Sequence, residues 1–180
     1  MNIGIVGSFG EYSSLFDSSY PLDEMSLHSW MNVRTGTDAV LFTGGLDVKD
    51  SMSRTLAERK IAEYCMAENI PLIGICRGMQ LLGYLSNIPL TEHIDGHMSC
   101  THEVQDWRGR KFNVKGDHHQ AVPYQEDGSV DVILTALDGI VEAAYFPKVN
   151  GFGVQYHPEW MDDRSIGYRW FQSRLKEFIK

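Results

Sequence analysis

The segment that most constrains the fold is the apolar run Leu72–Ile75, which leads directly into a helical segment, Gly78–Leu85. The junction between them is Gly74-Ile75-Cys76-Arg77-Gly78. A residue placed between a strand and a helix takes a strained backbone, and glycine neighbours let the turn close without side-chain clashes. A buried strand that feeds a helix in this way is typical of α/β folds, in which ligands bind at the carboxyl ends of the strands. Cys76 is therefore expected at a ligand-binding edge.

The rest of the chain predicts alternating strands and helices, followed by a second half that is richer in strands. Strand-like runs cover residues 2–6 and 39–42, and residues 51–68 carry apolar side chains at helical spacing. Further strand-like runs cover 101–105, 111–114, 130–135, 140–146 and 153–156. A closing helix is expected from about residue 162, with Asp162 or Asp163 as its N-cap and an apolar face made of Phe171, Leu175, Phe178 and Ile179. We predict one α/β domain over residues 1–180, with a mostly parallel sheet flanked by helices and a β-rich addition in the second half.

The composition limits the kind of partner. Apolar residues make up 43% of the 180 residues and charged residues 22%, which is ordinary for a soluble domain. The net charge of −8 and the scattered Lys and Arg argue against nucleic acid, and the lack of about 18 consecutive apolar residues argues against a membrane span. Three cysteines at unrelated spacings, with no secretory leader at the N-terminus, favour a cytoplasmic protein with at least one free thiol.

Cys76 is the candidate nucleophile. In the pattern Gly-x-Cys-x-Gly the thiol projects from a sheet edge at a helix N-terminus, where unpaired N–H groups and the helix dipole lower the pKa of a thiol. The N–H of Arg77 is the natural donor to an oxyanion at that point. The alternative interpretation is a buried structural thiol beside two incidental glycines, because free cysteine is among the most buried residue types.

His157 and Glu159 are the candidate partners of Cys76. Pro158 separates them and fixes its own φ, so that the two side chains can be held in one defined relation. The imidazole would take the thiol proton while the carboxylate keeps the ring in one tautomer. A second oxyanion donor is predicted at the N–H of Gly45, because Thr43-Gly44-Gly45 ends a neighbouring strand. Taken alone, His157 could be a surface loop residue and the glycines an ordinary turn.

Two blocks together resemble a known family. Gly74-Ile75-Cys76-Arg77-Gly78-Met79-Gln80 and Gly153-Val154-Gln155-Tyr156-His157-Pro158-Glu159 are similar to the two signature blocks of the class I glutamine amidotransferases, in the same order and spacing. The resemblance runs from residue 39 to residue 159. It implies a flavodoxin-like sheet, a γ-glutamyl thioester on Cys76, a role for Gln80 in holding the glutamyl group, and no cofactor.

A third block narrows the resemblance. Asp117-His118-His119-Gln120-Ala121-Val122 is similar to the His-His-Gln block of the free-standing γ-glutamyl hydrolases, such as those acting on γ-glutamyl-γ-aminobutyrate. The resemblance makes His118, His119 and Gln120 candidate contacts to a small-molecule γ-glutamyl substrate, and His102 a weaker one. The chain departs from that branch at Thr43, where the family usually has proline, at residues 114–116 and in its short length, so the leaving group stays open.

Other functions compete with this one. His93, His97, Cys100 and His102, with His118-His119 further on, suggest zinc, but only the first pair approaches the paired spacing of structural zinc sites, so no metal is predicted. A glutaminase subunit that passes ammonia to a separate synthetase is the main alternative to a free hydrolase. A non-catalytic binding module is a further one. Another family with a cysteine elbow typically has His directly after the cysteine, where this chain has Arg77.

Overall fold

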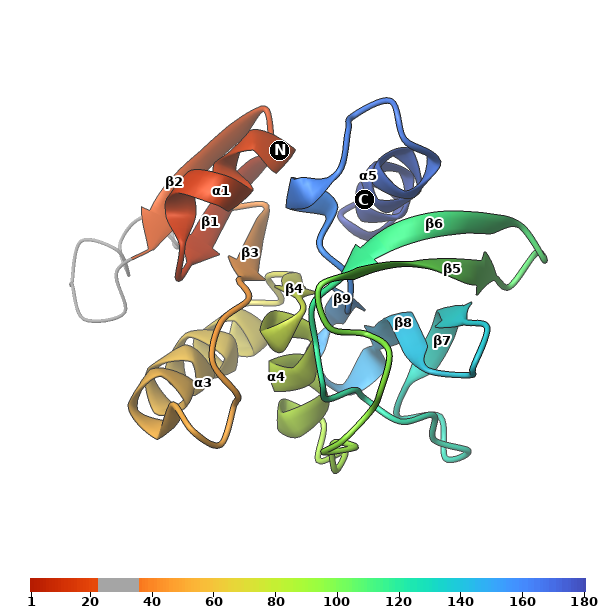
Figure 1. Cartoon of the computed structure of the whole chain (residues 1–180). Coiled ribbons are helices and arrows are strands. Elements are labelled where there is room, and N and C mark those ends of the chain that lie inside the picture. Colours follow the sequence, from red (N-terminus) through yellow and green to blue (C-terminus); the bar gives the residue numbers. More distant parts are fainter. Residues whose placement is uncertain (23–35) are drawn as a thin grey trace.

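The computed structural model describes residues 1–22 and 36–180. Within these residues one nine-stranded sheet runs through the molecule in the order β2-β1-β3-β4-β9-β8-β7-β5-β6 (Figure 1). Its strands are β1 (Asn2–Val6), β2 (Ser18–Leu22), β3 (Ala39–Phe42), β4 (Leu72–Ile75), β5 (Cys100–Asp106), β6 (Lys111–Gly116), β7 (Asp131–Ala136), β8 (Val141–Phe146) and β9 (Gly151–Val154). The helices are α1 (Phe9–Tyr12), α3 (Met52–Ala67), α4 (Arg77–Leu85) and α5 (Ile166–Phe178), with short 3₁₀ turns at η1 (Ser13–Leu15), η2 (Pro147–Val149) and η3 (Pro158–Trp160).

The sheet has a parallel half and an antiparallel half. Strands β2, β1, β3, β4 and β9 pair in parallel, whereas β8, β7, β5 and β6 continue the sheet in antiparallel pairs. The change of direction falls between β9 and β8. This arrangement confirms the predicted mostly parallel sheet flanked by helices, with a β-rich addition in the second half.

Apolar side chains fill both faces of the sheet. One core packs β1, β3, β4 and β9 against α1 and α5 through residues such as Ile5, Tyr12 and Phe171. The other packs the opposite face against α3 and α4, with Phe42, Ile61 and Leu82 among its members. Figure 1 shows α3 and α4 on one side of the sheet and α1 and α5 on the other. Strands covered on both faces read as continuous apolar runs, which is why β3 and β4 stood out in the sequence.

The structure departs from the expectations drawn from the sequence at two places. Strand β2 was not predicted because Pro21 breaks a strand pattern; the strand lies at the edge of the sheet, where proline is tolerated. The N-cap of α5 is Ser165, whose hydroxyl accepts from the N–H of Tyr168, and not Asp162 or Asp163. Asp162 instead accepts from the N–H of Arg164.

The predicted alternation of strands and helices between residues 6 and 39 falls partly outside the described residues. No helix in the described ranges is long and apolar enough to cross a membrane.

Candidate active site

Cys76 lies at the sharp turn between β4 and α4. Its φ is 52° and its ψ is −110°, a backbone conformation that residues with side chains rarely adopt. The turn also packs very tightly. A Cβ on Gly78 would lie 2.0 Å from the carbonyl oxygen of Phe42 in β3, and one on Gly74 would lie 2.4 Å from the carbonyl carbon of Gly78. The two glycines therefore let the elbow sit directly against the neighbouring strand.

The imidazole of His157 is held from two sides just beyond β9. Its Nδ1 and Glu159 Oε1 are 2.6 Å apart, so Nδ1–H donates to the carboxylate. The indole of Trp160 stacks on the ring at a centroid distance of 3.7 Å and an interplanar angle of 9°. The backbone N–H of His157 donates to the carbonyl of Lys115 over 2.8 Å. A ring fixed in this way presents Nε2 in one direction.

Cys76 and His157 are neighbours. A Cβ on Gly44 would lie 3.4 Å from His157 Cε1 and 3.8 Å from Cys76 Cβ. Burial lowers the pKa of His157, but the interactions of the ring with Cys76 and Glu159 outweigh burial and raise the pKa to about 10. No described residue gives Nε2 a hydrogen bond of standard geometry, and the thiol makes a weak one, over 3.8 Å, to the carbonyl of Asp117. The imidazole thus has one nitrogen on a carboxylate and the other available on the side of the thiol.

Tyr12 is a part of the site that the sequence did not reveal. Its buried hydroxyl accepts the N–H of Gly44 over 3.1 Å. Burial first, and then the charge of Glu159, raise the pKa of Tyr12 well above its usual range, so the hydroxyl stays neutral. On the other side of the turn, Arg54 donates to the carbonyl of Gly44 over 3.2 Å. Both the N–H and the carbonyl of Gly44 are therefore hydrogen-bonded. The next residue, Gly45, has a φ of +143° and lies at the edge of a cavity.

The side chain of Arg77 is buried against α3. It is 1% exposed, and its Nη1 donates to Glu58 Oε2 of α3 over 2.6 Å, while its Nη2 donates to Thr55 Oγ1 over 2.9 Å. Glu58 also accepts from Arg54 Nε over 2.7 Å. A buried ion pair of this kind is costly to break because a single buried charge is left behind. It ties the start of α4 to α3 and leaves only the backbone of Arg77 for chemistry.

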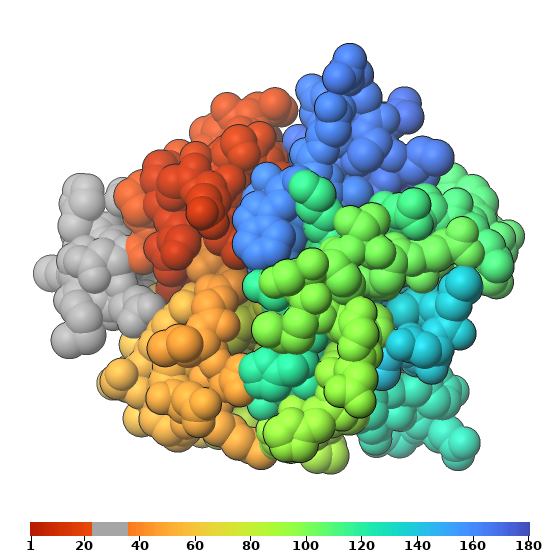
Figure 2. Space-filling view, in the orientation of Figure 1, coloured from red at the N-terminus to blue at the C-terminus, as the bar shows by residue number. Residues whose placement is uncertain are grey.

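The predicted substrate contacts surround one cavity of about 300 Å³. Its lining comprises Gly45, Leu46, Asp47, Asp50, Cys76, Gln80, Met98, Asp117, His118, His119 and Gln120. Leu46, Asp47, Asp50 and Met98 were not predicted because they lie in loops without a recognisable motif, and Asp117 was noted only as the first residue of the His-His-Gln block. In Figure 2 the orange segment after β3 and the green segments before β5 and after β6 meet on this face.

Hydrogen bonds fix several of the lining side chains. Gln80 Nε2 donates to the carbonyl of Gln120 over 3.2 Å, and Gln120 Nε2 donates to Glu92 Oε2 over 2.8 Å. His119 Nε2 lies 3.0 Å from Asp47 Oδ2. His157 and Glu159 are not among the residues that line this cavity. His102, the weaker candidate, is also outside it and contacts Glu142 instead.

A family comparison agrees with this geometry. The model of "Glutamine amidotransferase class-I" matches residues 6–171, a range that begins at the last residue of β1 and includes the Cys76 elbow and the His157 turn. The chain belongs to the class I glutamine amidotransferase family.

Two relatives illustrate the similarity in sequence. The chain is 32% identical over 151 residues to the γ-glutamyl-CDP-amidate hydrolase of Campylobacter jejuni, an alignment that covers 77% of the chain and 72% of the relative. It is 27% identical over 178 residues to the chloroplastic carbamoyl phosphate synthase small chain of Arabidopsis thaliana, covering 97% of the chain but 38% of that relative.

Solved structures share the fold at low identity. A glutamine amidotransferase from Thermotoga maritima superposes with a TM-score of 0.68 at 15% identity, covering 98% of the chain and 83% of its own. A protein of Thermoplasma acidophilum assigned to GMP synthase superposes with a TM-score of 0.72 at 14% identity, covering 99% and 92%. The chain thus shares its overall fold with these two structures.

Proposed function

We propose that the protein hydrolyses a γ-glutamyl amide bond, with Cys76 as nucleophile, His157 as the proton carrier and Glu159 as the residue that orients His157. One observation carries the proposal: an imidazole beside the thiol of a strained elbow has its other nitrogen 2.6 Å from a buried carboxylate. This is the arrangement in which a cysteine is activated by a base and the base is aligned by a third group.

The reaction would proceed in two steps. The Cys76 sulfur forms a bond to the γ-carbonyl carbon, the C–N bond breaks, and His157 gives its proton to the departing nitrogen. Water then attacks the thioester, its proton passes to His157, and the C–S bond breaks to release glutamate. The N–H groups of Gly45 and Arg77 would hold the oxyanion in both steps. Gly45 is the better donor of the glycine pair because the N–H of Gly44 is already bound to Tyr12.

The cavity lining suggests how the substrate is held. Asp47, Asp50 and Asp117 contribute three carboxyl groups to the lining of the cavity that also contains Cys76. Carboxylates attract the α-ammonium group of a γ-glutamyl substrate and would repel an anionic leaving group placed in the same space. Gln80, His119 and Gln120 would supply further polar contacts. This lining favours an amine over an amidate as the leaving group, whereas the name of the Campylobacter relative supports an amidate.

A substrate panel tests the proposal and ranks these leaving groups. The protein would be incubated with glutamine, γ-glutamyl-γ-aminobutyrate, γ-glutamyl polyamines and γ-glutamyl compounds with a phosphoramidate nitrogen, and released glutamate would be measured. We expect hydrolysis of at least one compound and a transient γ-glutamyl adduct in the mass of the Cys76 peptide. The matched control is Cys65→Ala, because Cys65 is a buried thiol in α3 whose burial raises its pKa to about 12. Equal glutamate release by Cys76→Ala would disprove the mechanism.

The main alternative is a glutaminase subunit that delivers ammonia to a separate synthetase. The similarity to carbamoyl phosphate synthase small chains supports it, although the chain spans only 38% and 30% of two of them. In that case glutamine would be the sole good substrate in the panel. Its hydrolysis would rise when the partner synthetase is added, whereas a free-standing hydrolase would show no such rise.

A further inference from the structure

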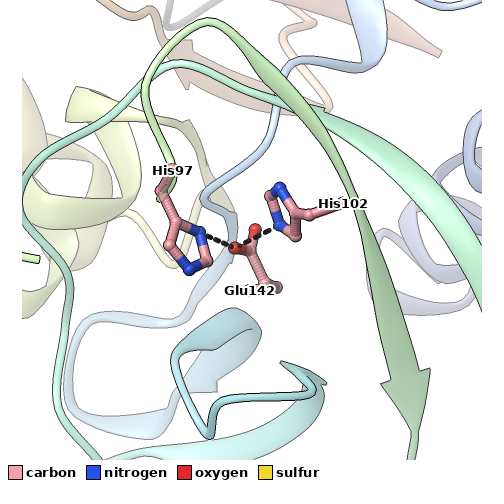
Figure 3. A group of neighbouring side chains, drawn as sticks. All are labelled: His97, His102 and Glu142. Carbon is pink, nitrogen blue, oxygen red and sulfur yellow. Dashed lines mark hydrogen bonds and ion pairs between the residues drawn. The ribbon is translucent and has the colours of Figure 1, made fainter. Parts of the chain in front are cut away.

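A second group of buried polar side chains lies in the antiparallel half, outside the proposed catalytic residues. Glu142 in β8 has no exposed side-chain surface, and three imidazoles converge on one of its oxygens. His102 Nε2, His97 Nδ1 and His118 Nε2 lie 2.8, 3.2 and 3.4 Å from Glu142 Oε1. Figure 3 shows the rings of His97 and His102 on either side of the carboxylate.

The hydrogen bonds of this cluster do not account for all of its polar atoms. Only His102 makes a hydrogen bond of standard geometry to Glu142. His97 Nδ1, His118 Nε2 and Glu142 Oε2 are buried and have no such bond with any described residue. Buried polar groups without partners cost free energy, and each one in a native structure asks for an explanation. An ion bound among these atoms would satisfy all three.

The ring spacing suits a metal ion. A tetrahedral zinc ion binds imidazole nitrogens at about 2 Å, which places the ring centroids roughly 5 Å apart. The centroid of the His97 ring is 4.5 Å from that of His102 and 4.9 Å from that of His118, and the remaining pair is 6.4 Å apart. The ligand atoms of His97, His102 and Glu142 lie within 4.8 Å of one another. Small side-chain movements would close this set around one ion.

The far side of each imidazole is also arranged as in metal sites. His97 Nε2 lies 2.9 Å from a carboxylate oxygen of Asp138, and His118 Nδ1 lies 3.0 Å from the carbonyl of Gln120. His102 Nδ1 lies 3.4 Å from the thiol of Cys100. Metal-bound histidines usually donate their other N–H to such a group, which fixes the tautomer and turns the ring toward the ion. The charge balances as well, since a divalent cation would be matched by Glu142 and Asp138 with neutral imidazoles.

We propose that His97, His102, His118 and Glu142 form a binding site for a divalent transition-metal ion such as zinc. Three imidazoles and one carboxylate complete a tetrahedral set, so the ion is structural and has no open position for a substrate. It would fix the segment from His118 to Gln120, which lines the active-site cavity. This metal site is independent of the proposed hydrolysis of a γ-glutamyl amide bond. It replaces the expectation, drawn from ligand spacing in the sequence, that no metal binds.

Zinc uptake by the whole chain carrying Cys76→Ala tests the site, since that substitution excludes zinc binding by Cys76 together with His157. After dialysis against a chelator and then against zinc, we expect one tightly bound ion per chain and a higher unfolding temperature than without metal. Cobalt in place of zinc should give the intense visible absorption of a four-coordinate ion. A chain that takes up no stoichiometric zinc would overturn the proposal.

Further substitutions in this background assign the ligands. Glu142→Gln and His102→Asn should each abolish stoichiometric binding, whereas Asp138→Asn should weaken it by roughly 10–100-fold because it removes only the group behind His97. His93→Gln is the matched control: it removes an exposed histidine of the same segment and should bind zinc as tightly as the parent. Circular dichroism without metal identifies variants that fail to fold. Full zinc binding by folded Glu142→Gln and His102→Asn would overturn the proposal, as would equal loss in His93→Gln.

Discussion

Two parts of the protein place a buried imidazole beside a buried carboxylate, but they are assembled differently. We call them the Cys76 edge (Cys76, His157 and Glu159) and the Glu142 cluster (His97, His102, His118 and Glu142). At the Cys76 edge, His157 and Glu159 come from one turn of chain and the thiol from one elbow, at the ends of adjacent parallel strands. In the Glu142 cluster, the four residues come from the loop before β5, from β5, from the segment after β6 and from β8. The first arrangement leaves one imidazole nitrogen on the side of the Cys76 thiol, whereas the second turns its imidazole nitrogens inward on one oxygen of Glu142.

This difference suggests separate roles for the parallel half and the antiparallel half of the sheet. The parallel half brings strand ends together at one edge, where strained turns hold reactive groups at a cavity. The antiparallel half brings side chains together across neighbouring strands, where they are enclosed and can be cross-linked by an ion. The first region should therefore control the rate of reaction and the second the stability of the cavity wall. The following predictions separate these two effects.

The largest effect is expected from Cys76→Ala. If the thiol forms the covalent bond, hydrolysis should fall by about 10⁴-fold or more, because loss of a nucleophile removes the whole pathway. Zinc uptake and the unfolding temperature with zinc should stay close to those of the wild type. Initial rates of glutamate release and metal analysis of the same preparation provide the two measurements. A joint loss of activity and zinc uptake would show that the two regions are not separate.

Gly78→Ala should act on stability. The new Cβ would lie 2.0 Å from a backbone oxygen of β3 that cannot move aside, so overpacking should lower the free energy of unfolding by about 3 kcal/mol. Gly10→Ala is the control, since nothing lies within 4 Å of its added Cβ. Urea titration followed by tryptophan fluorescence measures both variants. An undiminished unfolding free energy in Gly78→Ala would mean that the elbow does not pack against β3 as described.

Glu159→Gln should leave more activity than Cys76→Ala, with a loss of roughly 10²-fold. The pKa of His157 is about 10, and Glu159 is one of the groups that raise it. In the proposed mechanism the protonated ring gives a proton to the leaving nitrogen, so activity should fall as pH rises through that pKa. Removing the carboxylate lowers the pKa, and the alkaline limb of the kcat/KM profile should move to lower pH. An alkaline limb that does not move would show that Glu159 has no electrostatic effect on the ring.

The smallest effect is expected from Tyr12→Phe. Loss of the hydroxyl frees the N–H of Gly44 and one contact near Glu159, while the ring still fills its place in the core. The turn at Gly44-Gly45 should loosen slightly and kcat should fall about threefold, in line with one neutral hydrogen bond. Zinc uptake should not change. A rise in KM with an unchanged kcat would assign Tyr12 to substrate binding rather than to positioning of the turn at Gly44-Gly45.

The sequence predicted those parts of the candidate site that lie in short motifs of contiguous residues. The elbow around Cys76 and the pair His157 and Glu159 were predicted because each is a short motif whose spacing reflects local geometry. Ser165 was missed as a cap because Asp162 and Asp163 are equally good cap residues, and the choice depends on where the helix can dock. Tyr12 was missed because its partner Gly44 is its neighbour only through strand pairing.

The Glu142 cluster could not be predicted from the spacing of metal ligands along the sequence. Along the chain, His93, His97, Cys100 and His102 form a local group whose spacing suits zinc poorly. In the fold, His93 lies on the surface, and Glu142 joins the set through β8, which no local pattern connects to β5. Ligand sets gathered from distant strands require the sheet order, and that order is decided by packing of the whole chain.

The stacking of Trp160 on His157 has a consequence for observation. Excited indole loses fluorescence to a protonated imidazole in contact with it more readily than to a neutral one, and a cationic ring is also attracted to the indole face. Trp160 is 39% exposed, so its emission also depends on the solvent at its ring. The molecule therefore contains its own optical probe for proton movement, one that could follow single turnovers in a stopped-flow instrument without any added label.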